Sequence, residues 1–173
     1  MAPQTAAAQS PENTLVIEAD TGVITIEMLP QIAPKHVEQI RKLANSGAYD
    51  GVAFHRVIRG FMAQTGDVQF GKAEPGSNEY FRAGTGGSDM PDIPAEFSGV
   101  PYERGIVGMA RSRNPNSANS QFFIMFTAYP SLNGQYTVWG QVIDGMDAVD
   151  AIAKGEPPAN PSRMIRVRTA DQR

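Results

Sequence analysis

The sequence contains no cysteine, which excludes disulfide bonds, a thiolate nucleophile and cysteine-based zinc sites. Its only two histidines, His36 and His55, lie far apart and outside any HExxH pattern, so we expect no metal. No hydrophobic run approaches the roughly 20 residues needed to cross a bilayer, so we expect no membrane partner. The formal net charge is -3, which argues against a nucleic-acid partner.

What is present is typical of an ordinary globular protein. The chain has 173 residues, of which 41% are hydrophobic and 19% charged. A chain of this length can bury a core of its own, and we predict one domain over residues 14–170 after a flexible tail over residues 1–13. This tail lacks a signal sequence, so we expect a cytoplasmic protein. A small, polar tail also remains after signal removal, so a periplasmic location is the alternative.

Hydrophobic periodicity predicts a mainly β protein. The stretch "TLVIEADTGVITIEML" predicts a hairpin around Asp20, Thr21 and Gly22, where turn residues tolerate positive φ. "APKHVEQIRKLANSG" predicts a helix with its apolar face at Val37, Ile40 and Leu43. Further strands are predicted over 54–57, 61–66, 105–110, 121–126, 137–143 and 164–169, and a second helix over 146–155. We therefore expect a closed eight-stranded antiparallel β-barrel capped by two α-helices.

Three local features are given plain structural interpretations. "GDVQFGKA" resembles a phosphate-binding loop but lacks the final hydroxyl residue, so we interpret it as a surface loop within the long segment 67–97. "GTGG" lacks a third glycine and is interpreted as a tight turn. His36, in the first helix, is expected at the surface or its boundary.

Two strands combine apolar and polar side chains on one face. Met62 shares a face with Gln64, and Gln121 shares one with Phe123. The opposite face of the later strand is predicted to be core: Phe122, Ile124 and Phe126. An apolar floor with a few amides is typical of a binding groove. The plain alternative is that the phenylalanines are core and the glutamines solvated.

These groups belong to longer motifs that resemble the cyclophilins, the cyclosporin-binding class of peptidyl-prolyl cis-trans isomerases. The motifs are "FHRVIRGFMAQTGD", "GTGG", "PNSANSQFFI" and "LNGQYTVWGQVIDGMDAVDAI", and the similarity runs from about Leu15 to Thr169, closest to the bacterial branch. The resemblance implies an eight-stranded barrel with two helices and an enzyme that accelerates rotation about X-Pro bonds. It implies no cofactor, no metal and no covalent intermediate.

The resemblance also implies roles for particular residues. The catalytic arginine corresponds to Arg56, with His55 beside it and Gln64 as an orienting amide. His55 is interpreted as a pocket neighbour, with a buried structural role as the alternative. The implied substrate-binding residues are Phe61, Met62, Gly84, Thr85, Ala110, Arg111, Gln121, Phe123, Leu132 and Tyr136.

Some positions depart from the family pattern. Ser131 replaces a tryptophan of many eukaryotic relatives that helps to bind cyclosporin, so weak binding of that drug is expected. Tyr136 replaces a histidine and Arg111 a common asparagine. The implied partners are proline-containing, unfolded or flexible polypeptides, bound by a monomer. A holdase-type binding module that uses the same pocket is the alternative function, and a hydrolase centred on His55 is a remote third.

Overall fold

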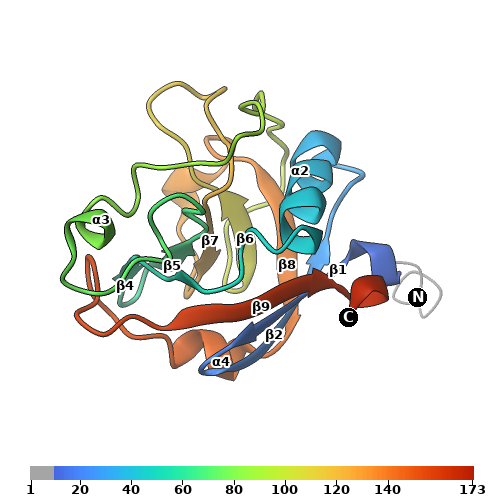
Figure 1. The fold of residues 1–173 in the computed structure, drawn as a ribbon. Helices are drawn as coiled ribbons and strands as arrows, with labels where there is room; N and C mark the ends of the chain where they lie inside the picture. Colours follow the sequence, from blue (N-terminus) through green and yellow to red (C-terminus); the bar gives the residue numbers. More distant parts are fainter. Residues whose placement is uncertain (1–9) are drawn as a thin grey trace.

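The computed structural model describes residues 10–173 as one strongly curled antiparallel sheet with short helices around it (Figure 1). Its strands are β1 (Thr14–Ala19), β2 (Gly22–Met28), β3 (Val52–Ala53), β4 (Arg56–Ile58), β5 (Met62–Thr65), β6 (Ile106–Met109), β7 (Phe122–Met125), β8 (Val138–Asp144) and β9 (Arg163–Thr169). Its helices are α2 (Pro34–Asn45), α3 (Asn78–Phe81) and α4 (Met146–Asp150), with 3₁₀ turns η1 (Pro11–Asn13), η2 (Pro130–Leu132) and η3 (Ala170–Gln172). None of the helices in this part of the chain is long and apolar enough to span a membrane.

The sheet corrects the expected closed eight-stranded barrel. Its nine strands run in the order β3-β9-β1-β2-β8-β6-β7-β5-β4, and the two edge strands are not paired with each other. The reason lies in the chain between residues 52 and 58, which supplies both edges. The chain runs on from β3 through Phe54 and His55 into β4 without a turn, so the two strands do not fold back on each other to pair.

The first hairpin is confirmed, with β1 and β2 paired from Thr14↔Glu27 to Ala19↔Gly22. Its turn differs in one respect from the expectation. Positive φ falls on Gly22, at 138°, and on neither Asp20 nor Thr21. Gly22 also faces Ala148 of α4 so closely that a side chain there would press on it. The predicted tail over residues 1–13 lies outside the described residues up to residue 9, and its last part forms η1.

Helix α2 begins with Pro34, whose fixed φ suits the first turn, and buries the predicted face of Val37, Ile40 and Leu43. The expectation for His36 was wrong, because this side chain is fully buried. Glu96, from a distant loop, accepts the N–H groups of Lys35 and His36 and lies 2.6 Å from the His36 ring. Burial lowers the pKa of His36, although the Glu96 carboxylate opposes this shift.

Helix α4 is shorter than predicted. It ends at Asp150, and the chain passes through a turn and a bend at Ala151 and Ile152 before it reaches a β-bridge at Gly155. Val57 of β4 exchanges both backbone hydrogen bonds with Gly155, at 2.8 and 2.9 Å, which draws this segment to the sheet instead of into another helical turn. The pairing also holds the segment after Gly155 beside the edge strand.

Two groups of buried side chains lie on the two faces of β7. The main core contains Phe122 and Ile124, together with Trp139 and the buried face of α2. The second core contains Phe123 and Met125 with four further side chains: Met62, Tyr102, Ile106 and Val138. The predicted division of the β7 side chains between core and groove is therefore confirmed for Phe122 and Ile124, and Phe123 belongs to the smaller group.

The long segment 67–97 is more ordered than a surface loop. Asp67 is fully buried, and its carboxylate accepts four backbone N–H groups, from Gln69, Phe70, Gly84 and Gly86, at 2.8 to 3.0 Å. Charge-assisted bonds of this kind are among the stronger hydrogen bonds in proteins. The interpretation of "GDVQFGKA" as a plain surface loop was wrong, because its aspartate organises the loop that follows.

Candidate functional site

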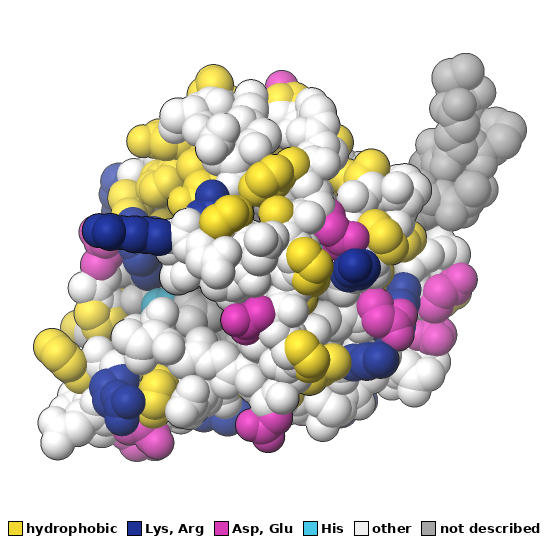
Figure 2. Space-filling view, turned by 90° about the horizontal axis from the view of Figure 1, so that it is seen from above, with side chains coloured by type: hydrophobic (Ala, Val, Ile, Leu, Met, Phe, Trp, Pro, Cys, Tyr) yellow, Lys and Arg dark blue, Asp and Glu magenta, His cyan; other side chains and the backbone are white. Residues whose placement is uncertain are grey.

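An apolar cavity of about 240 Å³ lies beside the second core. Its lining residues come from β4, β5, β7 and the segment after β6 and around η2: Arg56, Phe61, Met62, Gln64, Ala110, Arg111, Phe123, Leu132 and Tyr136. The ring of Phe123 packs edge-on against Tyr136 at 5.9 Å between centroids and stacks on Tyr102 at 5.7 Å. The walls of the apolar cavity are thus fixed by core packing, and Figure 2 shows hydrophobic side chains gathered beside basic ones on the upper face.

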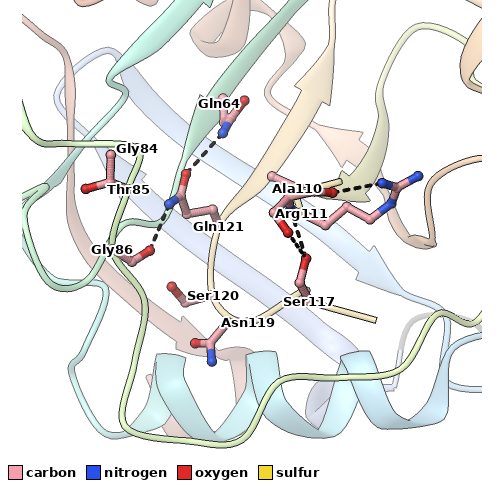
Figure 3. Close-up of a pocket in the computed structure, with 11 residues that line it drawn as sticks. Gln64, Gly84, Thr85, Gly86, Ala110, Arg111, Ser117, Asn119, Ser120 and Gln121 are labelled. Carbon is pink, nitrogen blue, oxygen red and sulfur yellow. Dashed lines mark hydrogen bonds between the residues drawn. The ribbon is translucent and has the colours of Figure 1, made fainter. Parts of the chain in front are cut away.

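A polar cavity of about 290 Å³ adjoins it and shares Gln64, Ala110 and Arg111. Its other lining residues are Gly84, Thr85, Gly86, Ser112, Ser117, Asn119, Ser120 and Gln121 (Figure 3). Gly84 and Gly86 of this cavity cannot readily be replaced by other residues. Gly84 has a φ of 104°, and a side chain at Gly86 would collide with Asp67 and Gln69. Only glycine allows this loop to lie so close to Asp67 and Gln69.

A line of hydrogen bonds connects the two cavities (Figure 3). Gln121 donates to the carbonyl of Gly86 at 2.9 Å and accepts from Nε2 of Gln64 at 3.0 Å. The side-chain oxygen of Gln64 then accepts from Nη1 of Arg56 at 3.4 Å. Antiparallel pairing of Arg56 with Gln64 and of Gln64 with Phe123 sets this order. The side chain of Arg56 is 44% exposed, so its guanidinium remains accessible to a bound molecule.

Arg111 forms the wall between the cavities. Its guanidinium lies over the ring of Tyr136 at 4.4 Å and donates to the carbonyls of Ser112 and Gln135 at 2.9 and 2.6 Å. It therefore joins the segment after β6 to the segment after η2. The link depends on the length of the arginine side chain and its several N–H donors.

His55 lies behind this surface and lines neither cavity. It is 4% exposed, and neither ring nitrogen has a hydrogen-bond partner among the described residues, although Gln121 lies near. Burial lowers its pKa to about 4, against the opposing charge of Asp67. Its ring packs under Gly84, where an added Cβ would come within 3.2 Å of it. The catalytic role of His55 stays a prediction, and this position favours the structural alternative.

The structure brings the other predicted site residues together in these two cavities. Gly84, Thr85 and Gln121 line the polar cavity, and the rest line the apolar cavity or both. Sequence reasoning missed Asp67, Asn119 and the serines near Arg111. The one usable signal was the position of Asp67 directly after a strand and a glycine. Within Ser10–Arg173, no three His, Asp or Glu side chains are grouped to hold a metal ion.

Comparison with known proteins agrees with this geometry. The family model described as "Cyclophilin type peptidyl-prolyl cis-trans isomerase/CLD" matches residues 14–171. This chain belongs to the cyclophilin-type peptidyl-prolyl cis-trans isomerase family. A probable peptidyl-prolyl cis-trans isomerase of Brucella suis is 62% identical over 157 residues, which cover 91% of this chain and 80% of the relative. The peptidyl-prolyl cis-trans isomerase-like 3 protein of Rattus norvegicus is 38% identical over 82% of each chain.

Solved cyclophilin structures have the same fold. A cyclophilin from Hirschia baltica superposes with a TM-score of 0.81 at 28% identity, covering 94% of this chain and 75% of the other. A Cryptosporidium parvum cyclophilin in the presence of the dipeptide Ala-Pro gives 0.77 at 28% identity, covering 90% and 98%. The chain is accordingly a cyclophilin-type isomerase with a mainly β fold, and the Brucella relative agrees with the predicted bacterial branch.

Proposed function

We propose that this cyclophilin isomerises X-Pro bonds by holding the prolyl ring in the apolar cavity while Arg56 stabilises the twisted bond. The observation that carries the proposal is the position of Arg56 on the rim of a cavity lined by Phe61, Met62 and Phe123. The Ala-Pro dipeptide named with the Cryptosporidium relative supports a proline-containing ligand. Flexible or unfolded proline-containing polypeptides are the proposed substrates, bound by a monomer.

The chemistry requires no covalent step. Amide resonance gives the X-Pro bond a rotational barrier of roughly 18 to 20 kcal/mol. Twisting removes this resonance and localises a lone pair on the prolyl nitrogen. A guanidinium N–H donor meets a good acceptor there only near the twisted state, and this differential stabilisation accelerates rotation.

Arg56 does not account for the whole effect. A hydrogen bond to a charged group contributes about 1.5 to 3 kcal/mol, whereas a hundred-thousandfold acceleration needs roughly 7 kcal/mol. The remainder is assigned to the rigid apolar wall, which holds the ring and excludes water, and to Gln64, which orients Arg56. Gln121 and the Gly84–Gly86 loop hold the flanking chain in the polar cavity.

The test is Arg56→Ala, with turnover of a proline tetrapeptide as the measurement. We expect kcat/KM to fall well over tenfold while the unfolding midpoint stays within a few degrees, because Arg56 is exposed and outside both cores. Arg59→Ala, which removes a nearby arginine that lines neither cavity, is the matched control. Unchanged turnover in Arg56→Ala would contradict the proposal and would leave a proline-binding module as the better description of the site.

A further inference from the structure

Backbone pairing places Glu156 beside Arg56, so the contact does not depend only on the flexibility of the Glu156 side chain. The two backbone hydrogen bonds between Val57 and Gly155 place the residue after Gly155 next to the residue before Val57. Gly155 has a φ of 146°, and a Cβ there would come within 2.6 Å of Pro158. The register that presents Glu156 to Arg56 is therefore built into this edge of the sheet.

The contacts of Arg56 divide its guanidinium into a held side and an open side. Nε donates to Oε1 of Glu156 at 3.4 Å, and Nη1 donates to Oε1 of Gln64 at 3.4 Å. Within Ser10–Arg173 no hydrogen bond from Nη2 is found, so both of its N–H groups remain for a substrate. Two acceptors on different elements thus restrict the rotation of the side chain and leave its outer edge available.

We propose that Glu156 is a positioning residue for Arg56: its carboxylate holds Nε so that the Nη groups face the prolyl nitrogen. The inference rests on the proposed function of Arg56 and adds a second support, opposite Gln64. A long arginine side chain loses considerable rotamer entropy when it is ordered. If Glu156 orders it before the substrate binds, that cost no longer falls on the step in which the bond twists.

The expected effect is small but specific, since exposed ion pairs stabilise a geometry only modestly. For Glu156→Ala we expect kcat to fall about two- to fivefold with little change in KM, because the apolar cavity that binds the ring is intact. Glu156→Gln keeps an oxygen that can accept from Nε and should retain more than half of the wild-type kcat. A merely structural role would not separate kcat from KM in this way.

Glu38→Ala is a well-matched control. The Glu38 side chain is 56% exposed and that of Glu156 is 57% exposed, and each pairs with an arginine, Arg41 and Arg56 respectively. Glu38 lies on α2 and lines neither cavity. We expect Glu38→Ala to leave both kcat and KM at their wild-type values. That result would show that removal of an exposed ion pair does not by itself lower kcat.

A double-mutant cycle decides whether Glu156 acts through Arg56. With turnover measured at raised enzyme concentration, Glu156→Ala should cause no further loss in the Arg56→Ala background. The inference is overturned if Glu156→Ala matches wild type, if Glu156→Gln falls as far as Glu156→Ala, or if the loss persists without Arg56. Failure of the proposed function is distinct, because Arg56→Ala itself would then retain full turnover.

Discussion

The apolar and polar cavities share a wall but are built in different ways. Side chains of the second core form the apolar cavity, and stacked rings fix their positions. Loop backbone and short polar side chains form the polar cavity, and the buried carboxylate of Asp67 ties that loop together. A shape made by packing suits one rigid ring, whereas backbone groups and amides can accept many sequences. Under the proposed function, this difference would let one site select proline and accept varied neighbouring residues.

The largest effect is expected at Asp67, whose carboxylate holds the loop of the polar cavity. In Asp67→Asn, one carboxylate oxygen becomes an amide that faces two N–H donors, and each unsatisfied buried donor costs about 1 to 3 kcal/mol. We expect the free energy of unfolding in urea to fall by about 4 kcal/mol. Among folded molecules, KM for long peptides should rise more than KM for a short one.

Asp89→Asn is the control for that change, since Asp89 is an exposed aspartate of the same segment. It should leave the urea midpoint and both KM values unchanged. Equal KM values for long and short peptides in Asp67→Asn would contradict the assignment of the polar cavity to the flanking chain.

Low pH should also lower the free energy of unfolding, through His55, which packs beneath Gly84 of the polar cavity. The pKa of His55 is about 4 in the folded protein and near 6.5 when unfolded, so the unfolded chain binds the proton more readily. The contribution to stability is fully present above pH 6.5 and is lost as the pH falls towards 4, by roughly 3 kcal/mol in total.

Urea unfolding of wild type and His55→Gln between pH 7 and 4 measures this contribution. Glutamine does not titrate, so the difference between the two free energies of unfolding should shrink or change sign as the pH falls. A difference that stays constant across this range would show that His55 is not the titrating group. Because His36 is present in both proteins, its own lowered pKa cancels in the comparison.

Phe122 and Phe123 test whether the apolar cavity itself matters for activity, because they lie next to each other on β7 but face different cores. Phe123→Leu should lower kcat/KM for a proline tetrapeptide about tenfold, since it removes a wall of the apolar cavity. Phe122→Leu should lose similar stability, within the usual 0.5 to 3 kcal/mol, with little loss of kcat/KM. Equal losses of activity in the two variants would indicate that the apolar cavity does not distinguish them.

Sequence periodicity predicted the parts of the fold that depend on neighbouring residues. Local patterns predicted strands at β1, β2 and β7 and the buried face of α2, and the structure confirms these elements. Burial does not alternate in β7, where all four residues are buried, because both faces of this strand pack against a core. The two-residue strand β3 is too short to have a period, and its pairing with β9 arises from contacts more than 100 residues apart in sequence. The expected closed barrel was wrong for the same reason: the pairing of edge strands depends on contacts between distant segments, and no single segment predicts it.

The candidate site could be predicted only where a motif carried it. Arg56, Gln64 and Phe123 stand in long motifs that resemble the cyclophilins, and the structure brings them to one place. The supports around them are different in kind. Glu96 reaches His36 from 60 residues away, and Glu156 reaches Arg56 from 100 residues away. Such contacts depend on where the fold places a single carboxylate, and no local sequence pattern predicts that position.

The central claim is that Arg56 stabilises the twisted bond more than it stabilises the bound peptide. Exchange NMR of a proline peptide saturated with enzyme measures the cis-trans interconversion rate on the protein, and titration gives Kd separately. For Arg56→Ala the account predicts an on-enzyme rate at least tenfold below wild type, with Kd changed only a few-fold. An unchanged on-enzyme rate together with a large rise in Kd would contradict it.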